Sequence, residues 1–159
     1  MNARNALGMS ALSAMGAILF SGHLSAVHAA DTDDVAAASQ GFYAALSVID
    51  DGSAMSEVWA QTPYVTFVGP RSKSPIVGWD AQKNYWVNAN KLFAKRDVTL
   101  SEQHLHVDGN LAWEVGQESA DVELADGTAR KTDNLVTNVY EKIDGKWLMV
   151  SHQAQPIPK

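Results

Sequence analysis

Three Asp-Gly pairs, each 18 residues after the last, organise the second half of this sequence: Asp108-Gly109, Asp126-Gly127 and Asp144-Gly145. Asp-Gly between apolar runs predicts a tight hairpin turn, because glycine readily adopts the positive φ that such turns need. Three successive turns define four antiparallel strands, which we predict at residues 98–107, 111–124, 129–143 and 147–154. The inner strands hold roughly 14 residues against a usual 5–6. Strands of that length accumulate twist and bend, so the sheet should curl around the segment that precedes it.

The first of these strands changes face along its length. Val98 and Leu100 share one side of the strand, whereas Leu105 and Val107 share the other. A strand keeps its apolar residues on one side unless an extra residue shifts the alternation. We therefore predict a β-bulge at residues 101–104.

The segment upstream of these strands has helical periodicity. The acidic residues 31–34 suit the start of a first helix, and Ser53 suits the start of a short second one. A β-branched and aromatic run at residues 64–68 predicts a short strand, and a third helix follows at residues 79–95. The order predicts an α+β fold in which a curved antiparallel sheet wraps on three N-terminal helices.

The N-terminal 29 residues have the pattern of a secretory signal peptide. Arg4 is followed by an apolar stretch at residues 6–20, and Val27-His28-Ala29 places small residues before a cut at Ala30. We expect cleavage there, with export to the periplasm or the medium, and a single domain over residues 30–159.

The composition of residues 30–159 argues against several classes of function. Without Arg4 the chain holds 11 basic and 18 acidic residues, a net charge of −7, and it contains no cysteine. A chain with this negative net charge is repelled by a phosphate backbone and by an anionic membrane. We therefore expect neither nucleic acid nor membrane as a partner. The lack of cysteine excludes disulfides and thiolate chemistry.

Three motifs carry a family resemblance over nearly all of this domain. They are Val77-Gly78-Trp79-Asp80, the hairpin run 104–110, and Thr137-Asn138-Val139-Tyr140 continuing into Asp144-Gly145-Lys146-Trp147. Together with the element order they resemble the nuclear transport factor 2-like superfamily, in particular its SnoaL-like branch and the association domain of calcium/calmodulin-dependent protein kinase. The resemblance implies a cone-shaped fold, a pocket between the concave sheet and the helices, and a homodimer formed through the outer face of the sheet.

The superfamily includes isomerases, cyclases, dehydratases, oligomerisation modules and simple binders, so residues must decide the function. Steroid-isomerase chemistry needs a carboxylate base, a tyrosine and a neutral aspartic acid. The resemblance places the base on or beside Phe67, the acidic donor on or beside Val139, and the tyrosine on Phe42 or its neighbour Tyr43. Phe67 and Val139 are hydrocarbon, so we assign no catalytic set.

A metal site on His104 and His106 is a further hypothesis, since two histidines two residues apart share one face of a strand. A third ligand would have to be His152, three strand spacings or ~14 Å away. We therefore expect no metal and no cofactor.

A binding pocket without catalysis is the interpretation that we favour. All five tryptophans lie in residues 30–159, and large aromatic faces between helices and sheet suit a small apolar or aromatic ligand. The predicted ligand-binding residues are Tyr43, Trp59, Phe67, Trp86, Trp113, Val139 and His152. Glu118, Thr137 and Asn138 are possible polar groups on the walls of an interior otherwise lined by hydrocarbon and rings.

Two alternatives to ligand binding stay open. One is a SnoaL-like isomerase, cyclase or hydrolase that uses Tyr43, His152 or Asp133 as acid or base. The other is a homo-oligomerisation domain without a ligand.

Overall fold

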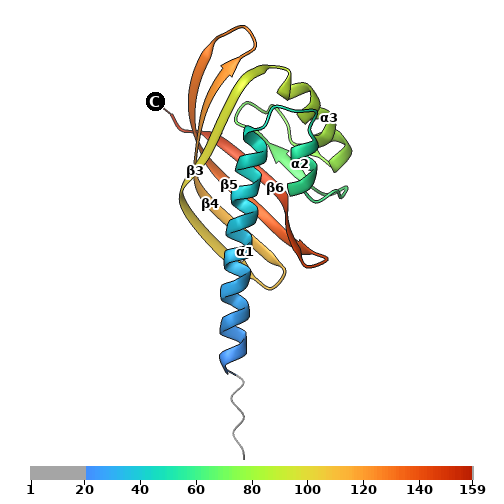
Figure 1. Cartoon of the computed structure of the whole chain (residues 1–159), viewed down its shortest axis with the longest axis vertical. Helices are drawn as coiled ribbons and strands as arrows, with labels where there is room; N and C mark the ends of the chain where they lie inside the picture. Colours follow the sequence, from blue (N-terminus) through green and yellow to red (C-terminus); the bar gives the residue numbers. More distant parts are fainter. Residues whose placement is uncertain (1–20, 159) are drawn as a thin grey trace, which may run out of the picture.

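A computed structural model describes the backbone of residues 21–158 and the side chains of residues 31–158. Its elements in chain order are α1 (Ser21–Ser47), α2 (Ser53–Val58), β1 (Thr66–Val68), β2 (Ile76–Val77), α3 (Trp79–Asn90), β3 (Phe93–Asp108), β4 (Leu111–Leu124), β5 (Ala129–Ile143) and β6 (Lys146–Pro156). The strands form one six-stranded sheet in the order β2-β1-β6-β5-β4-β3, in which only the β1–β6 pair is parallel. The predicted α+β fold, a curved sheet with three helices, is confirmed (Figure 1).

The three predicted hairpins join β3 to β4, β4 to β5 and β5 to β6. In the last of them Asp144 and Gly145 have φ of 51° and 79°. A two-residue turn with positive φ at both positions matches the twist of the flanking strands, which is why Asp-Gly is found there. In the first hairpin the two turn residues are Gly109-Asn110, one position later than predicted.

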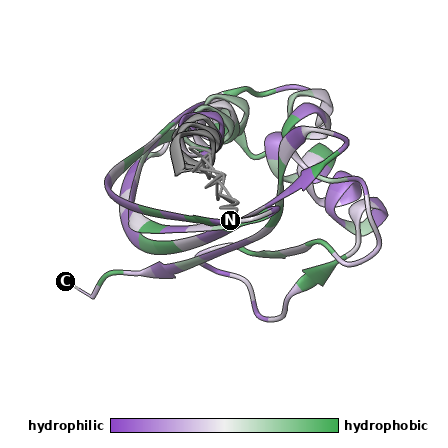
Figure 2. Ribbon diagram, turned by 90° about the horizontal axis from the view of Figure 1, so that it is seen from below, coloured by the Kyte–Doolittle hydropathy of each residue, from purple (hydrophilic) through white to green (hydrophobic). Residues whose placement is uncertain are grey.

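The predicted bulge in β3 is confirmed. The register of β3 against β4 shifts between Ser101 and His104, and Glu102 has a φ of 50°. Val98 before the shift and Val107 after it are both buried. A second shift, between Val139 and Tyr140, interrupts the pairing of β5 with β6. With the twist of such long strands, these irregularities curl the sheet around the helices (Figure 2).

The helix boundaries differ from the predicted ones. α1 begins at Ser21 and not at residues 31–34, so Asp31 lies within the helix, where its carboxylate pairs with Lys142 of β5. Of the predicted signal peptide, residues 1–20 lie outside the described residues and 21–29 belong to α1. Within residues 21–158 no helix is long and apolar enough to cross a membrane.

The boundaries of the two shorter helices also differ from the predicted ones. Gly52, with a φ of 88°, takes the N-cap position of α2 instead of Ser53, and the carboxylate of Asp50 accepts hydrogen bonds from the backbone N–H groups of Gly52 and Ala54 at 2.7 and 2.8 Å. α3 ends at Asn90, not at residue 95, because the chain enters β3 at Phe93.

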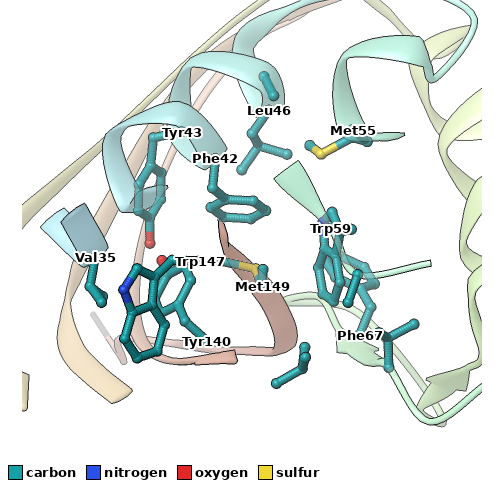
Figure 3. Packing of buried hydrophobic residues seen from close by; sticks show 14 of the residues in the cluster. Val35, Phe42, Tyr43, Leu46, Met55, Trp59, Phe67, Tyr140, Trp147 and Met149 are labelled. Carbon is teal, nitrogen blue, oxygen red and sulfur yellow. The ribbon is translucent and has the colours of Figure 1, made fainter. Parts of the chain in front are cut away.

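The apolar core lies between α1 and the concave face of the sheet. Phe42 and Tyr43 of α1 point toward Tyr140, Trp147 and Met149 of the sheet (Figure 3). Along β4 and β5 the even-numbered side chains face this interior and the odd-numbered ones face outward, since residues 112, 114, 118, 134, 136, 138 and 140 are all buried. This alternation decides which of the predicted site residues can face a ligand.

Candidate functional site

A cavity of about 330 Å³ lies between α3, the loop after β1 and the concave face of the sheet. Its apolar wall includes Phe67 of β1 and Tyr85 and Trp86 of α3, whose rings lie 4.7–5.1 Å apart. Its polar lining includes Arg96, Glu118, Asn134 and His152. A mostly apolar pocket with a few polar groups is typical of small-molecule sites.

Three of the seven predicted ligand-binding residues line this cavity: Phe67, Trp86 and His152. Tyr43 and Trp59 lie in the core beside it. Trp59 is 1 % exposed and packs edge-on against Phe67, and the hydroxyl of Tyr43 accepts a hydrogen bond from Asn138 at 3.0 Å.

The remaining two, Trp113 and Val139, do not face the cavity. They are paired across β4 and β5, and Val139 is half-buried against the hydrophobic core. Trp113 is 39 % exposed, and its ring packs on that of His106, 4.3 Å away. Trp113 therefore lies on the outer face of the sheet, and neither residue is part of the cavity lining.

The expectation that the interior is otherwise lined by hydrocarbon and rings is wrong. Glu114 of β4 is fully buried. Its Oε1 accepts hydrogen bonds from Ser39 at 2.9 Å, Asn138 at 2.7 Å and Tyr140 at 2.7 Å, and its Oε2 accepts one from Gln103. Four converging donors suit an ionised carboxylate, which can only accept.

Asn138 connects this carboxylate to His152. The Nδ2 group of Asn138 donates to Glu114, so its Oδ1 points the other way, where it lies 2.7 Å from Nδ1 of His152. An amide oxygen can only accept, so Nδ1 must carry the proton. Nε2 of His152 is then left with a free lone pair.

Burial keeps the His152 ring neutral. The residue is 2 % exposed, and desolvation lowers its pKa from 6.5 to about 3. Its ring stacks on that of Phe67, with centroids 5.3 Å apart and planes 12° apart. At neutral pH His152 therefore offers the cavity a hydrogen-bond acceptor rather than a cation.

Glu118 and Asn134 form a second polar pair in the lining. Nδ2 of Asn134 donates to Oε1 of Glu118 at 3.0 Å. Burial raises the pKa of Glu118. Neither Oε2 of Glu118 nor Oδ1 of Asn134 has a partner among the described residues.

The two polar groups lie in different rows of the sheet. Glu114, Asn138 and His152 are register partners across β4, β5 and β6, whereas Glu118 pairs with Asn134. The rows are four residues apart along β5, or ~13 Å. Glu118 and His152 are therefore not placed as an acid and a base acting on one ligand atom.

Arginines give the cavity a positive character. Arg71, Arg96 and Arg130, all the arginines in the described part of the chain, contribute to its lining. Arg96 is buried and donates hydrogen bonds to the carbonyl oxygens of Leu46 and Val48. None of the three forms an ion pair within residues 31–158.

The other residues considered from the sequence lie away from the cavity. Asp133 is exposed and accepts a hydrogen bond from Ser119 at 2.8 Å on the outer face. Thr137 is also exposed, and so are His104 and His106. Within the described residues, no three His, Asp or Glu side chains gather closely enough to hold a metal ion.

Sequence reasoning missed Glu114 and Arg96. Glu114 shares the even-numbered face of β4 with Ala112 and Gly116, while the neighbouring large apolar residues Leu111, Trp113 and Val115 occupy the odd face. The usual rule of apolar side chains inward therefore selected the wrong face. Arg96 directly follows the predicted third helix, residues 79–95, and lies in β3 instead.

Solved structures with this fold include a candidate dehydratase of the NTF2-like family from Streptomyces avermitilis, with a TM-score of 0.72 and 21 % identity over 82 % of this chain and 99 % of that one. An NTF2-like superfamily protein from Salmonella enterica serovar Typhimurium has a TM-score of 0.71 and 21 % identity, covering 86 % and 94 %. The association domain of the C. elegans kinase CaMKII has a TM-score of 0.62 and 16 % identity, covering 81 % and 98 %. At these identities the likeness establishes the fold alone.

No curated protein matches this chain closely enough to serve as a relative. The family model of the SnoaL-like domain matches residues 35–158, which is most of the chain and includes every residue of the cavity. The motifs and this match agree, and the chain, which has the fold of the NTF2-like structures, belongs to the SnoaL-like domain family.

Proposed function

We propose that this protein is an exported small-molecule-binding domain that takes a mostly apolar or aromatic ligand in the cavity between α3 and the sheet. The observation that carries the proposal is the cavity itself, about 330 Å³ in volume and walled by the rings of Phe67, Tyr85 and Trp86. A few polar groups beside such a wall can orient a ligand without dominating its affinity.

The position of two tryptophans provides the test. Trp86 lines the cavity, whereas Trp113 lies on the opposite face of the sheet. Tryptophan fluorescence should change on titration with a member of a library of steroids, fatty acids and aromatic compounds. The change should persist in Trp113→Phe and shrink in Trp86→Phe. A library without any response from the folded wild type would contradict the proposal and favour a ligand-free oligomerisation domain.

We also propose that the protein forms a homodimer through the outer face of the sheet. Four large apolar side chains are exposed there, at 39–57 %: Leu111, Trp113, Val115 and Leu135. A contiguous exposed apolar patch is typical of an interface. Leu135→Lys should give a folded monomer by light scattering, whereas Val77→Lys, at an exposed apolar residue on the edge strand β2, should leave a dimer. A monomeric wild type would refute the proposal.

An acid–base enzyme of the isomerase or dehydratase type is the second candidate. The observation in its favour is the neutral His152, whose Nε2 holds the lone pair that a general base requires. Against it, the family resemblance places the carboxylate base of steroid-isomerase chemistry on or beside Phe67, which is hydrocarbon. Time-dependent conversion of a bound compound, lost in His152→Gln with binding retained, would establish the enzyme. Binding without conversion over hours would favour a binding domain without catalysis.

A further inference from the structure

We infer that the ligand of this cavity presents a hydrogen-bond donor, a hydroxyl or an N–H group on an apolar or aromatic body, to Nε2 of His152. The inference deepens the proposed function and depends on it. It follows from a chain of hydrogen bonds that runs from Glu114 through Asn138 to His152. This chain determines which nitrogen of the His152 ring carries the proton.

The first step is the direction of the Asn138 amide. Oε1 of Glu114 receives donors from Ser39 and Tyr140 as well as from Asn138, at 2.7–2.9 Å. Turning the amide round would place its oxygen against the carboxylate, two acceptors at hydrogen-bond distance. Burial makes an unsatisfied or repelling pair costly. The carboxylate therefore holds Nδ2 of Asn138 toward itself.

The second step is the histidine tautomer. With Nδ2 directed at Glu114, Oδ1 of Asn138 is the atom 2.7 Å from Nδ1 of His152. The proton must lie on Nδ1, so Nε2 has none. The ring does not take up a second proton at neutral pH, because it is buried and desolvation lowers its pKa.

The third step is what the cavity can offer Nε2. His152 is part of the cavity lining, and its hydrogen bond to Asn138 is made by Nδ1, which leaves Nε2 on the other side of the ring. An acceptor at the wall of an apolar pocket favours ligands with a donor over those without one, since an unmatched polar group there loses its hydrogen bond. A ligand that carries only acceptors, such as an ether or an ester, gains nothing at this nitrogen.

The tautomer can be tested without any ligand. In uniformly ¹⁵N-labelled full-length protein, long-range ¹H–¹⁵N correlation spectra identify the ring of His152 as the one missing in His152→Gln. We expect the pattern of a proton on Nδ1 at pH 7. A proton on Nε2, or a charged ring, would overturn the inference whatever the protein binds.

Ligand preference is tested with two probes that differ by one donor, 2-naphthol and 2-methoxynaphthalene, by isothermal titration calorimetry. Wild type should bind 2-naphthol at least tenfold more tightly. His152→Phe keeps an aromatic ring beside Phe67 but removes the acceptor, so the two probes should bind it within about threefold. Phe67→Leu is the matched control: affinity for both probes should fall together and the preference should persist.

Each other result counts against the inference. Equal binding of both probes to wild type would overturn it and leave the proposed binding function standing. A preference that survives in His152→Phe would place the donor contact elsewhere and overturn it too. If wild type binds neither these probes nor any member of the library, the proposed function fails and the inference fails with it.

Discussion

Replacing Glu114 by glutamine removes one charge from the polar network at nearly constant shape. An amide oxygen offers the three donors at Oε1, from Ser39, Asn138 and Tyr140, the same two lone pairs as a carboxylate oxygen, but without the negative charge. All three bonds therefore fall from charge-assisted to ordinary strength, a loss of about 1 kcal/mol each.

Part of this loss is recovered, because the amide need not be desolvated as an ion. We expect Glu114→Gln to lower the free energy of unfolding by about 2 kcal/mol. Urea unfolding followed by tryptophan fluorescence measures it, as a decrease of about 1 M in the midpoint at the slope usual for small domains. Glu123→Gln is the control, an exposed position on the same strand, which should stay within about 0.5 kcal/mol of wild type. If Glu114→Gln were as stable as that control, the carboxylate charge would not be what the four donors require.

Three further perturbations test other parts of the account. Because burial lowers the folded pKa of His152 to about 3, only the unfolded chain takes up its proton below pH 6.5, so wild type should lose about 2 kcal/mol more than His152→Gln between pH 7 and pH 5 in urea unfolding; equal losses would mean a solvated ring. Burial raises the pKa of Glu118, so its carboxylate opposes folding once it ionises, and Glu118→Gln should raise the melting temperature at pH 8 more than at pH 4; an equal change at both would contradict this. Gly145→Ala should cost about 1–2 kcal/mol from backbone strain alone, because φ is 79° and an added Cβ would meet no atom within 4 Å; thermal melts unchanged by the substitution would refute the assigned turn.

The sheet could be predicted from the sequence because its signals are local. The Asp-Gly turns fix where each strand ends, and the bounds of β4 and β5 agree with the predicted ones. The bulge at Ser101–His104 was also predictable, since a change of apolar face within one strand has few other causes. The helix ends were not, because Asp50 caps α2 from outside the helix and α1 continues upstream past Asp31.

The polar interior could not be predicted because it depends on which face of the sheet the helices cover. Trp113 and Leu135 are two large apolar residues of β4 and β5 that the rule of apolar side chains inward would bury, and both are exposed. The buried face instead carries Glu114 and Asn138, which are stable there only because donors from three other segments reach the carboxylate. The one local sign of the buried face in β4 was the glycine at position 116. In the structure an added Cβ there would lie 2.8 Å from the side chain of Leu100 in β3, so a larger residue would not fit.

A crystal structure of the protein grown with 2-naphthol tests the central claim most directly, that the concave side of the sheet holds a small molecule. The account predicts density for the aromatic ring against Phe67 and Trp86, with the hydroxyl oxygen within hydrogen-bond distance of Nε2 of His152. A cavity closed by the side chains of its own lining, or the probe bound only on the outer face around Trp113, would contradict it.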